Sequence, residues 1–312
     1  MNKALLVALS VLLAGISSLA IAQDNRDIVG TWRLSAVEHV AEGADGERIG
    51  GSRGVLIIDG AGYVFEFFST TSRNEPEVSP TDPQRTLQSF GGFWGRYVLD
   101  AGEGRIDFES VGGVSPSVHG LSFSRRYELT GDRLVVTSGD EPQAQGDKRW
   151  IWERMPIVEN LSEAYREVVG FWEHVEEYRA DTTTGEISNR NRRAPSVIVY
   201  TPSGFVGVHF PTLGRDSFVD PADPTDDEAR AAVRGYLGYF GTLGVYPGEV
   251  SHNLLSGISP GTGSILRRYA EIEDDVLTVT LQGGGAALPV VEPRSVTKVV
   301  LRRLSGADDM LR

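Results

Sequence analysis

Gly30-Thr31-Trp32 and Gly170-Phe171-Trp172 open two stretches of this 312-residue chain that carry the same landmarks in the same order. Each stretch continues with a glycine-containing hairpin, a strand that reads aromatic-aromatic-glycine, and a strand that contains Arg-Arg-Tyr. The matching pairs are Asp59–Val64 with Thr201–Val206, Phe93-Trp94-Gly95 with Tyr239-Phe240-Gly241, and Arg125-Arg126-Tyr127 with Arg267-Arg268-Tyr269. This repeat is much longer than the roughly 20–50 residues of a solenoid unit, so it predicts a duplicated domain.

The landmarks divide the chain into five parts. We predict a signal peptide over 1–22, a first domain over 23–156 and a helical linker over 157–168. A second domain covers 169–305, and a short tail covers 306–312. At this size each domain can bury a core of its own.

The first 22 residues have the composition of a secretory signal. Lys3 gives the positive start, an apolar run extends from Ala4 to Ala20, and Ala20-Ile21-Ala22 supplies the small residues that a signal peptidase recognises. We therefore expect a periplasmic or secreted protein with no integral membrane segment after cleavage. An uncleaved N-terminal anchor is the alternative.

Composition excludes several classes of function. The chain has no cysteine, which excludes thiolate nucleophiles, iron–sulfur clusters and cysteine zinc sites. Its net charge of −13 argues against nucleic acids and anionic membrane surfaces as partners. The five histidines have no paired spacing of the kind that metal sites use, so we predict neither a metal nor another cofactor.

Short apolar segments bounded by turn residues predict antiparallel β structure. The expected strands of the first domain are 30–40, 54–58, 63–68, 92–99, 105–111, 121–129, 133–138 and 149–155. Those of the second are 170–179, 196–200, 205–210, 238–246, 249–255, 264–272, 276–281 and 297–304. Eight such strands most economically close into a barrel without exposed edges, and a two-sheet sandwich is the competing arrangement.

Two short helices are also expected. One runs from about Asn160 to Val168, between the domains. The other begins at Thr225, whose side chain can cap the helix, and ends near Gly235. That second helix could form a lid over a barrel mouth or close the barrel base.

Gly30-x-Trp32, with Arg154 at the end of the last strand, resembles the lipocalin hallmark, in which an Arg lies across a buried Trp. Gly170-x-Trp172 with Arg302 or Arg303 repeats it. The second half resembles more specifically the bacterial lipocalin-like domain family, through Tyr200–Gly204, Gly235–Gly241 and Val250–Asn253. The resemblance implies two tandem eight-stranded calycin-type barrels and, loosely, a small hydrophobic ligand. Asn253 departs from the family, where a second His often follows the first.

Strand alternation then suggests ligand-orienting residues in the second barrel. His209 shares a face with Phe205 and Gly207, and His252 shares one with Val250 and Leu254, which suggests interior positions where the two rings could meet. Tyrosine hydroxyls and one arginine could assist them. The candidate ligand-binding residues are His209, His252, Tyr236, Tyr239 and Arg267. A histidine satisfied within the core or at the rim is the alternative for both His209 and His252.

The first domain offers fewer candidates. Glu66 alternates with Val64 and Phe68, opposite the aromatic face of its strand. It could form an acid/base pair with Asp107 or Glu109, although a position on the barrel exterior is the commoner expectation. One Arg of each Arg-Arg pair could face the interior, although a surface ion pair is the simpler expectation. The first half is aromatic where the second is small or polar, for example at Phe108, which corresponds to His252. This asymmetry predicts a first barrel filled by its own side chains and a second one left open.

We therefore expect a binding protein for a small hydrophobic or amphipathic molecule, held mainly in the second barrel. The alternative is a cofactor-independent cyclase, isomerase or hydratase that acts on an unsaturated substrate, with His252 as acid/base and Tyr236 as its partner. A structural envelope protein with two filled barrels is a third possibility.

Overall fold

The computed structural model describes residues 27–39, 47–49, 51–70, 78–79, 81–139, 148–281 and 294–311. The predicted signal peptide over 1–22 lies outside these residues. Within the described ranges, no helix combines the length and the apolar character needed to cross a membrane.

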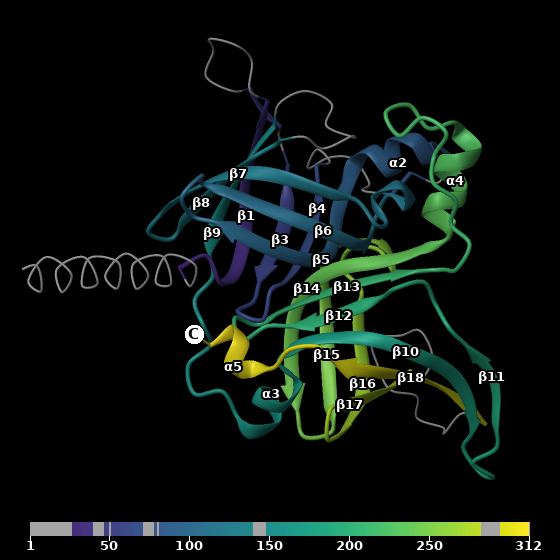
Figure 1. Cartoon of the computed structure of the whole chain (residues 1–312). Helices are drawn as coiled ribbons and strands as arrows, with labels where there is room; N and C mark the ends of the chain where they lie inside the picture. The colour runs from purple at the N-terminus through teal and green to yellow at the C-terminus, as the bar shows by residue number, and fades with distance from the viewer. Residues whose placement is uncertain are drawn as a thin grey trace, which may run out of the picture.

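Two antiparallel barrels make up the described chain (Figure 1). The first contains β1 (Gly30–His39), β3 (Arg53–Ile58), β4 (Tyr63–Ser69), β5 (Phe90–Asp100), β6 (Arg105–Gly113), β7 (Ser122–Thr130), β8 (Arg133–Thr137) and β9 (Lys148–Arg154). The second contains β10 (Gly170–Asp181), β12 (Val197–Tyr200), β13 (Phe205–Pro211), β14 (Tyr236–Tyr246), β15 (Glu249–Ser259), β16 (Ile265–Glu273), β17 (Val276–Leu281) and β18 (Ser295–Arg303).

Each barrel closes because its first strand pairs with both its second and its last. β1 pairs with β9 and β10 pairs with β18, so the barrel prediction is confirmed and the two-sheet sandwich is excluded. A ninth strand, which the alternation pattern did not reveal, extends each sheet beyond the barrel. These strands are β2 (Glu47–Ile49) on β1 and β11 (Ile187–Asn191) on β10.

The Trp plug is present in both barrels. Trp32 and Trp172 are fully buried, and the guanidinium carbons of Arg154 and Arg303 lie 4.1 and 4.0 Å from their ring centroids. Each arginine also donates to main-chain carbonyls just before its Trp, which holds the cation over the ring. Arg303 therefore fills the role that the sequence left open, while Arg302 forms an exposed ion pair.

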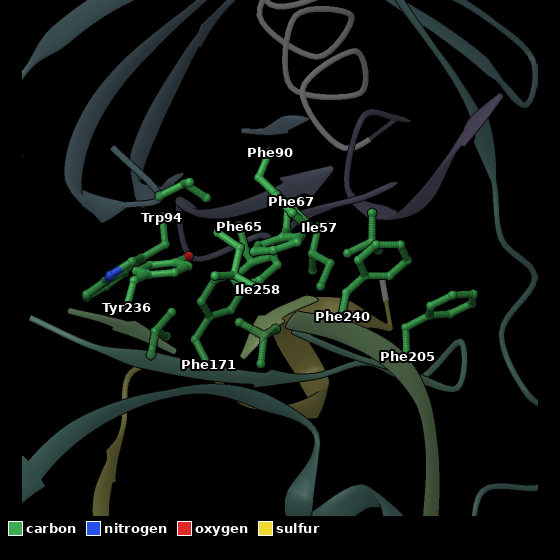
Figure 2. Packing of buried hydrophobic residues seen from close by; sticks show 14 of the residues in the cluster. Ile57, Phe65, Phe67, Phe90, Trp94, Phe171, Phe205, Tyr236, Phe240 and Ile258 are labelled. Atoms are coloured by element: carbon green, nitrogen blue, oxygen red, sulfur yellow. The ribbon is translucent and has the colours of Figure 1, made fainter. Parts of the chain in front are cut away.

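The largest apolar cluster lies between the barrels and not inside either of them. The outer faces of β3, β4 and β5 pack against those of β12, β13 and β14, and Figure 2 shows Phe67 near Phe240 and Trp94 beside Tyr236 across this boundary. Gly207 makes the approach possible, since a Cβ there would stand 2.5 Å from the Phe65 ring. The duplicated strands thus meet through a face that a single soluble barrel would expose to water.

Short helices connect and cover the barrels. α3 (Glu163–Val168) joins the two halves, and α5 (Ala307–Met310) follows the last strand. α2 (Pro83–Ser89) and α4 (Asp226–Arg234) lie side by side at the same edge of the molecule (Figure 1). A 3₁₀ turn, Pro116–Val118, follows β6. The Thr225 side chain accepts from the backbone N–H of Glu228, so the predicted cap of α4 is present.

Candidate functional site

A cavity of about 220 Å³ lies in the first barrel, which the sequence comparison had predicted to be filled. Its deep wall is formed by buried aromatic side chains of the barrel strands, and its rim by α2 and by a segment of the second half. The residues that line the cavity include Phe93, Phe123, Trp150, Val118, Leu87 and Phe218. The volume equals that of about seven molecules of liquid water, which is room for a small aromatic or short-chain molecule.

An ion pair lines the base of this cavity. Arg125 Nη1 lies 2.5 Å from Glu66 Oε2, and the two residues are only 5% and 1% exposed. The Arg125 guanidinium carbon lies between 4.7 and 5.6 Å from four ring centroids, those of Phe93, Phe108, Phe123 and Trp150. A buried carboxylate requires such a partner, and the flat guanidinium can stack on aromatic walls while it provides one. The cavity thus combines apolar walls with one fixed polar end.

The expectation that Glu66 lies on the exterior is therefore wrong. Strand β4 is buried on both faces, because its outer face packs on the second barrel. Phe65 and Phe67 are fully buried at that boundary, and Glu66 on the opposite face points into the first barrel. The aromatic face of β4 marks the contact between barrels, and the polar residue marks the interior.

The same inversion applies to His209, on β13. Its ring lies 4.5 and 5.6 Å from the rings of Phe65 and Phe67, so it faces the first barrel and not the interior of the second. Its Nε2 is 3.0 Å from the backbone carbonyl of Glu66, and its Nδ1 contacts the Tyr236 hydroxyl. A carbonyl only accepts, so Nε2 carries the proton and Nδ1 accepts from Tyr236. Burial lowers the pKa of His209 to about 3, which keeps the ring neutral.

His252 does point into the second barrel, where two tyrosines enclose it. The Tyr239 hydroxyl lies 2.8 Å from Nδ1, and the Tyr200 hydroxyl lies 3.2 Å from Nε2. All three residues are buried, and desolvation lowers the pKa of His252 to about 3 while raising those of both tyrosines. Register places Tyr200, Tyr239 and His252 where the first barrel has Ile58, Phe93 and Phe108. Three hydrogen-bonded polar side chains in the second barrel thus occupy the positions of three apolar side chains in the first.

Sequence comparison agrees with this architecture. Residues 169–303 match the family described as lipocalin-like domain. The second half of this chain is therefore a lipocalin-like domain. The chain has two such barrels in tandem, since the first has the same eight closed strands and the same Trp–Arg plug as the matched second one.

Two solved structures are similar to this lipocalin-like chain over most of its length. One is a protein with unknown function from the DUF3598 family of Nostoc punctiforme, 10% identical, with 89% of this chain and 97% of that chain covered and a TM-score of 0.23. The other is a bifunctional dehydratase-cyclase domain in ambruticin biosynthesis, 12% identical, with 95% and 83% covered and a TM-score of 0.12. Both TM-scores are too low to carry an argument about this protein. A search of curated proteins finds no match.

The five candidate residues of the second lipocalin-like barrel do not form one site. His252 and Tyr239 meet inside the barrel, whereas His209 and Tyr236 meet at the boundary between barrels. Arg267 points outward, where its guanidinium forms a two-pronged pair with an adjacent glutamate. The proposed acid/base pair of His252 and Tyr236 is therefore separated by the wall of the barrel.

The Arg-Arg-Tyr repeat also shifts by one residue in space. Phe108 pairs with Phe123, and His252 pairs with Leu266, so Arg125 corresponds to Arg268 and not to Arg267. Arg268 accordingly lies on the inward face of β16, close enough to depress the pKa of His252 further. In the first barrel Arg125 pairs with the carboxylate of Glu66. In the second barrel the position that corresponds to Glu66 is occupied by Val208.

Sequence reasoning missed the Glu66–Arg125 pair and the contribution of Phe218 to the cavity. One signal for the pair was available: a single acid in Val64–Phe68, an otherwise apolar strand, matches a single inward arginine three strands away. Strands buried on both faces show this pattern of near-continuous apolar residues. No comparable sequence signal predicted that Phe218, in the other half of the chain, would line the cavity.

Proposed function

We propose that this protein binds a small hydrophobic or amphipathic molecule in the cavity of its first barrel. The observation that carries the proposal is the cavity of about 220 Å³ itself, with aromatic walls and the Glu66–Arg125 pair at its base. The lipocalin-like domain in the second half of the chain supports a small apolar ligand for this fold. The aromatic rings supply most of the binding free energy, and the ion pair orients the polar end of the ligand.

Binding in the second barrel, as the sequence suggested, remains the rival location. There His252 is the polar group that would orient a ligand. Both of its ring nitrogens already have tyrosine partners, and the ring is neutral, so a ligand would have to displace a hydrogen bond. The same two partners leave it without a free nitrogen for acid/base chemistry, and for that reason we prefer binding to catalysis.

We also propose that the protein acts outside the cytoplasm. This rests on the apolar run and the small residues near position 22. N-terminal sequencing of the mature protein from a periplasmic extract tests it. A chain that begins at Gln23 supports export, and a chain that retains residues 1–22 in the cytoplasm contradicts it.

A fluorescence titration with 1-anilinonaphthalene-8-sulfonate tests the binding site. Val118→Trp places a large ring in the cavity and should weaken binding at least tenfold. Val98→Trp is the matched control, because Val98 is 67% exposed on the outer surface of β5 and does not line the cavity. Loss of binding in His252→Phe but not in Val118→Trp would locate the ligand in the second barrel instead.

A further inference from the structure

The rim of the first-barrel cavity is formed partly by the second half of the chain. Phe218, Pro221, Ala222 and Pro224 line the cavity together with the aromatic strands of the first barrel. These residues belong to the connection between β13 and α4, about 70 residues after Trp150 in the sequence, and they line the same cavity as Trp150. We call the stretch Phe218–Pro224 the cross-barrel lid.

Two hydrogen bonds hold the ends of the cross-barrel lid on the first half of the chain. The backbone N–H of Phe218 donates to Ser117 Oγ at 2.9 Å. At the other end, Gln84 Nε2 of α2 donates to the Pro224 carbonyl at 2.7 Å. Both ends of the lid are thus attached to residues of the first half of the chain.

Arg215, just before the lid, anchors it more firmly. Its guanidinium donates to the carbonyls of Gly113 and Val114 at the end of β6, and to that of Ala232 in α4. The Arg215 side chain thus connects the segment that leads into the lid with α4 and with the edge of the first barrel. Burial lowers the pKa of Arg215 only to about 10, so the side chain stays charged near neutral pH.

Neighbouring lid residues have opposite exposures. Phe218 is 7% exposed and packs in the cluster between the barrels, whereas Val219 is 94% exposed. Phe218 has the largest side chain among the lid residues that line the cavity. Only a residue that both lines the cavity and belongs to the covering segment can set the length of a bound molecule.

We propose that the cross-barrel lid closes the ligand site of the first barrel and that Phe218 sets the size of the ligand accepted there. The inference rests on the proposed function. The second half of the chain thereby takes part in binding, because it supplies the lid, while the ligand lies in the first barrel. The site is then complete only in the two-barrel protein.

Displacement of bound 1-anilinonaphthalene-8-sulfonate by linear alkyl carboxylates of increasing chain length tests the inference. In Phe218→Ala the preferred chain should lengthen, with affinity for longer members rising about fourfold per added methylene until the new space is filled. Phe218→Leu should give an intermediate shift and serves if the alanine variant does not fold. Val219→Ala is the control beside it and should keep the wild-type preference.

The outcomes separate the two proposals. Wild-type protein that binds neither the dye nor any carboxylate overturns the proposed function and this inference with it. Wild-type binding with an unchanged length preference in both Phe218 variants overturns the lid alone. A shift that appears equally in Val219→Ala also overturns it, because that side chain points away from the cavity.

Discussion

The imidazole of His209 donates from Nε2 to the backbone carbonyl of Glu66 across 3.0 Å, and this bond joins the two barrels. Glu66 is also the residue whose carboxylate pairs with Arg125 inside the first barrel. The backbone of one residue thus contacts the second barrel while its side chain lines the cavity. Changes at the boundary between barrels can therefore reach the candidate ligand site through a single strand, β4.

Removing the imidazole tests this connection. His209→Phe should lower the free energy of unfolding by about 2–4 kcal/mol, because it leaves the Tyr236 hydroxyl and a buried carbonyl without their partner. The double variant with Tyr236→Phe should recover part of that loss, since one of the orphaned groups is then gone. Urea denaturation of the four proteins in this cycle measures the coupling, and strictly additive losses would contradict the bond.

Gly207 should tolerate no side chain. A Cβ at this position would lie 2.5 Å from two atoms of the Phe65 ring, so Gly207→Ala should cost about 1–3 kcal/mol by forcing the barrels apart. Gly102→Ala is the control, because its Cβ would meet only an ordinary contact at 3.5 Å. Thermal unfolding compares them. Equal melting temperatures for the two variants would show that the barrels do not pack as described.

Removing one partner of the ion pair in the cavity should lower the free energy of unfolding strongly, whereas replacing both partners with apolar residues should change it little. Glu66→Gln leaves the Arg125 charge buried beside a neutral group and should destabilise the protein by about 3–5 kcal/mol. Glu66→Val with Arg125→Met, which introduces the valine found at the matching place of the second barrel, should be close to neutral. Chemical denaturation distinguishes the two, and a double variant no more stable than Glu66→Gln would contradict this view.

Stability should fall as pH drops below about 6.5. Burial lowers the pKa values of His209 and His252 to about 3 and that of His174 to about 4, whereas unfolded histidines titrate near 6.5. Between these values the unfolded chain binds more protons, so each fully buried histidine removes about 1.4 kcal/mol per pH unit of acidification.

Asp59 opposes this trend over part of the range. Burial raises its pKa from 3.8 to about 6, so between these values the folded state binds the extra proton and gains stability on acidification. The three histidines outnumber it, and the net loss should persist. Urea unfolding at a series of pH values in wild type and His252→Phe checks the sign. The variant should show a shallower slope by about one proton, and an identical slope would contradict the neutral buried ring.

Much of the fold follows from local patterns, because most neighbouring strands of each barrel are also consecutive in the sequence. The repeated Gly-x-Trp, the hairpin glycines and the terminal arginines were sufficient to predict two barrels, and Thr225 with the acids after it predicted the capped helix. Strands β2 and β11 were missed, since β11 is fully exposed and carries no alternation that a core would impose.

The site was harder to predict, because alternation separates two faces of a strand without saying which one faces inward. Phe65 and Phe67 look like the interior face of β4, yet they pack against another domain. His209 follows the same logic on β13. Only the packing of one barrel on the other resolves the choice, and that packing is a property of the whole chain. Phe218 could not be predicted for the same reason, since no local sequence pattern indicates that a residue of the second half lines the cavity of the first barrel.

A crystal structure of the full mature chain with a displacing alkyl carboxylate bound is the most direct test of the central claim. We predict ligand density in the first barrel, between Trp150 and the Phe218 ring, with the polar end toward Glu66 and Arg125. Density in the second barrel beside His252, with the first cavity containing only solvent, would contradict it.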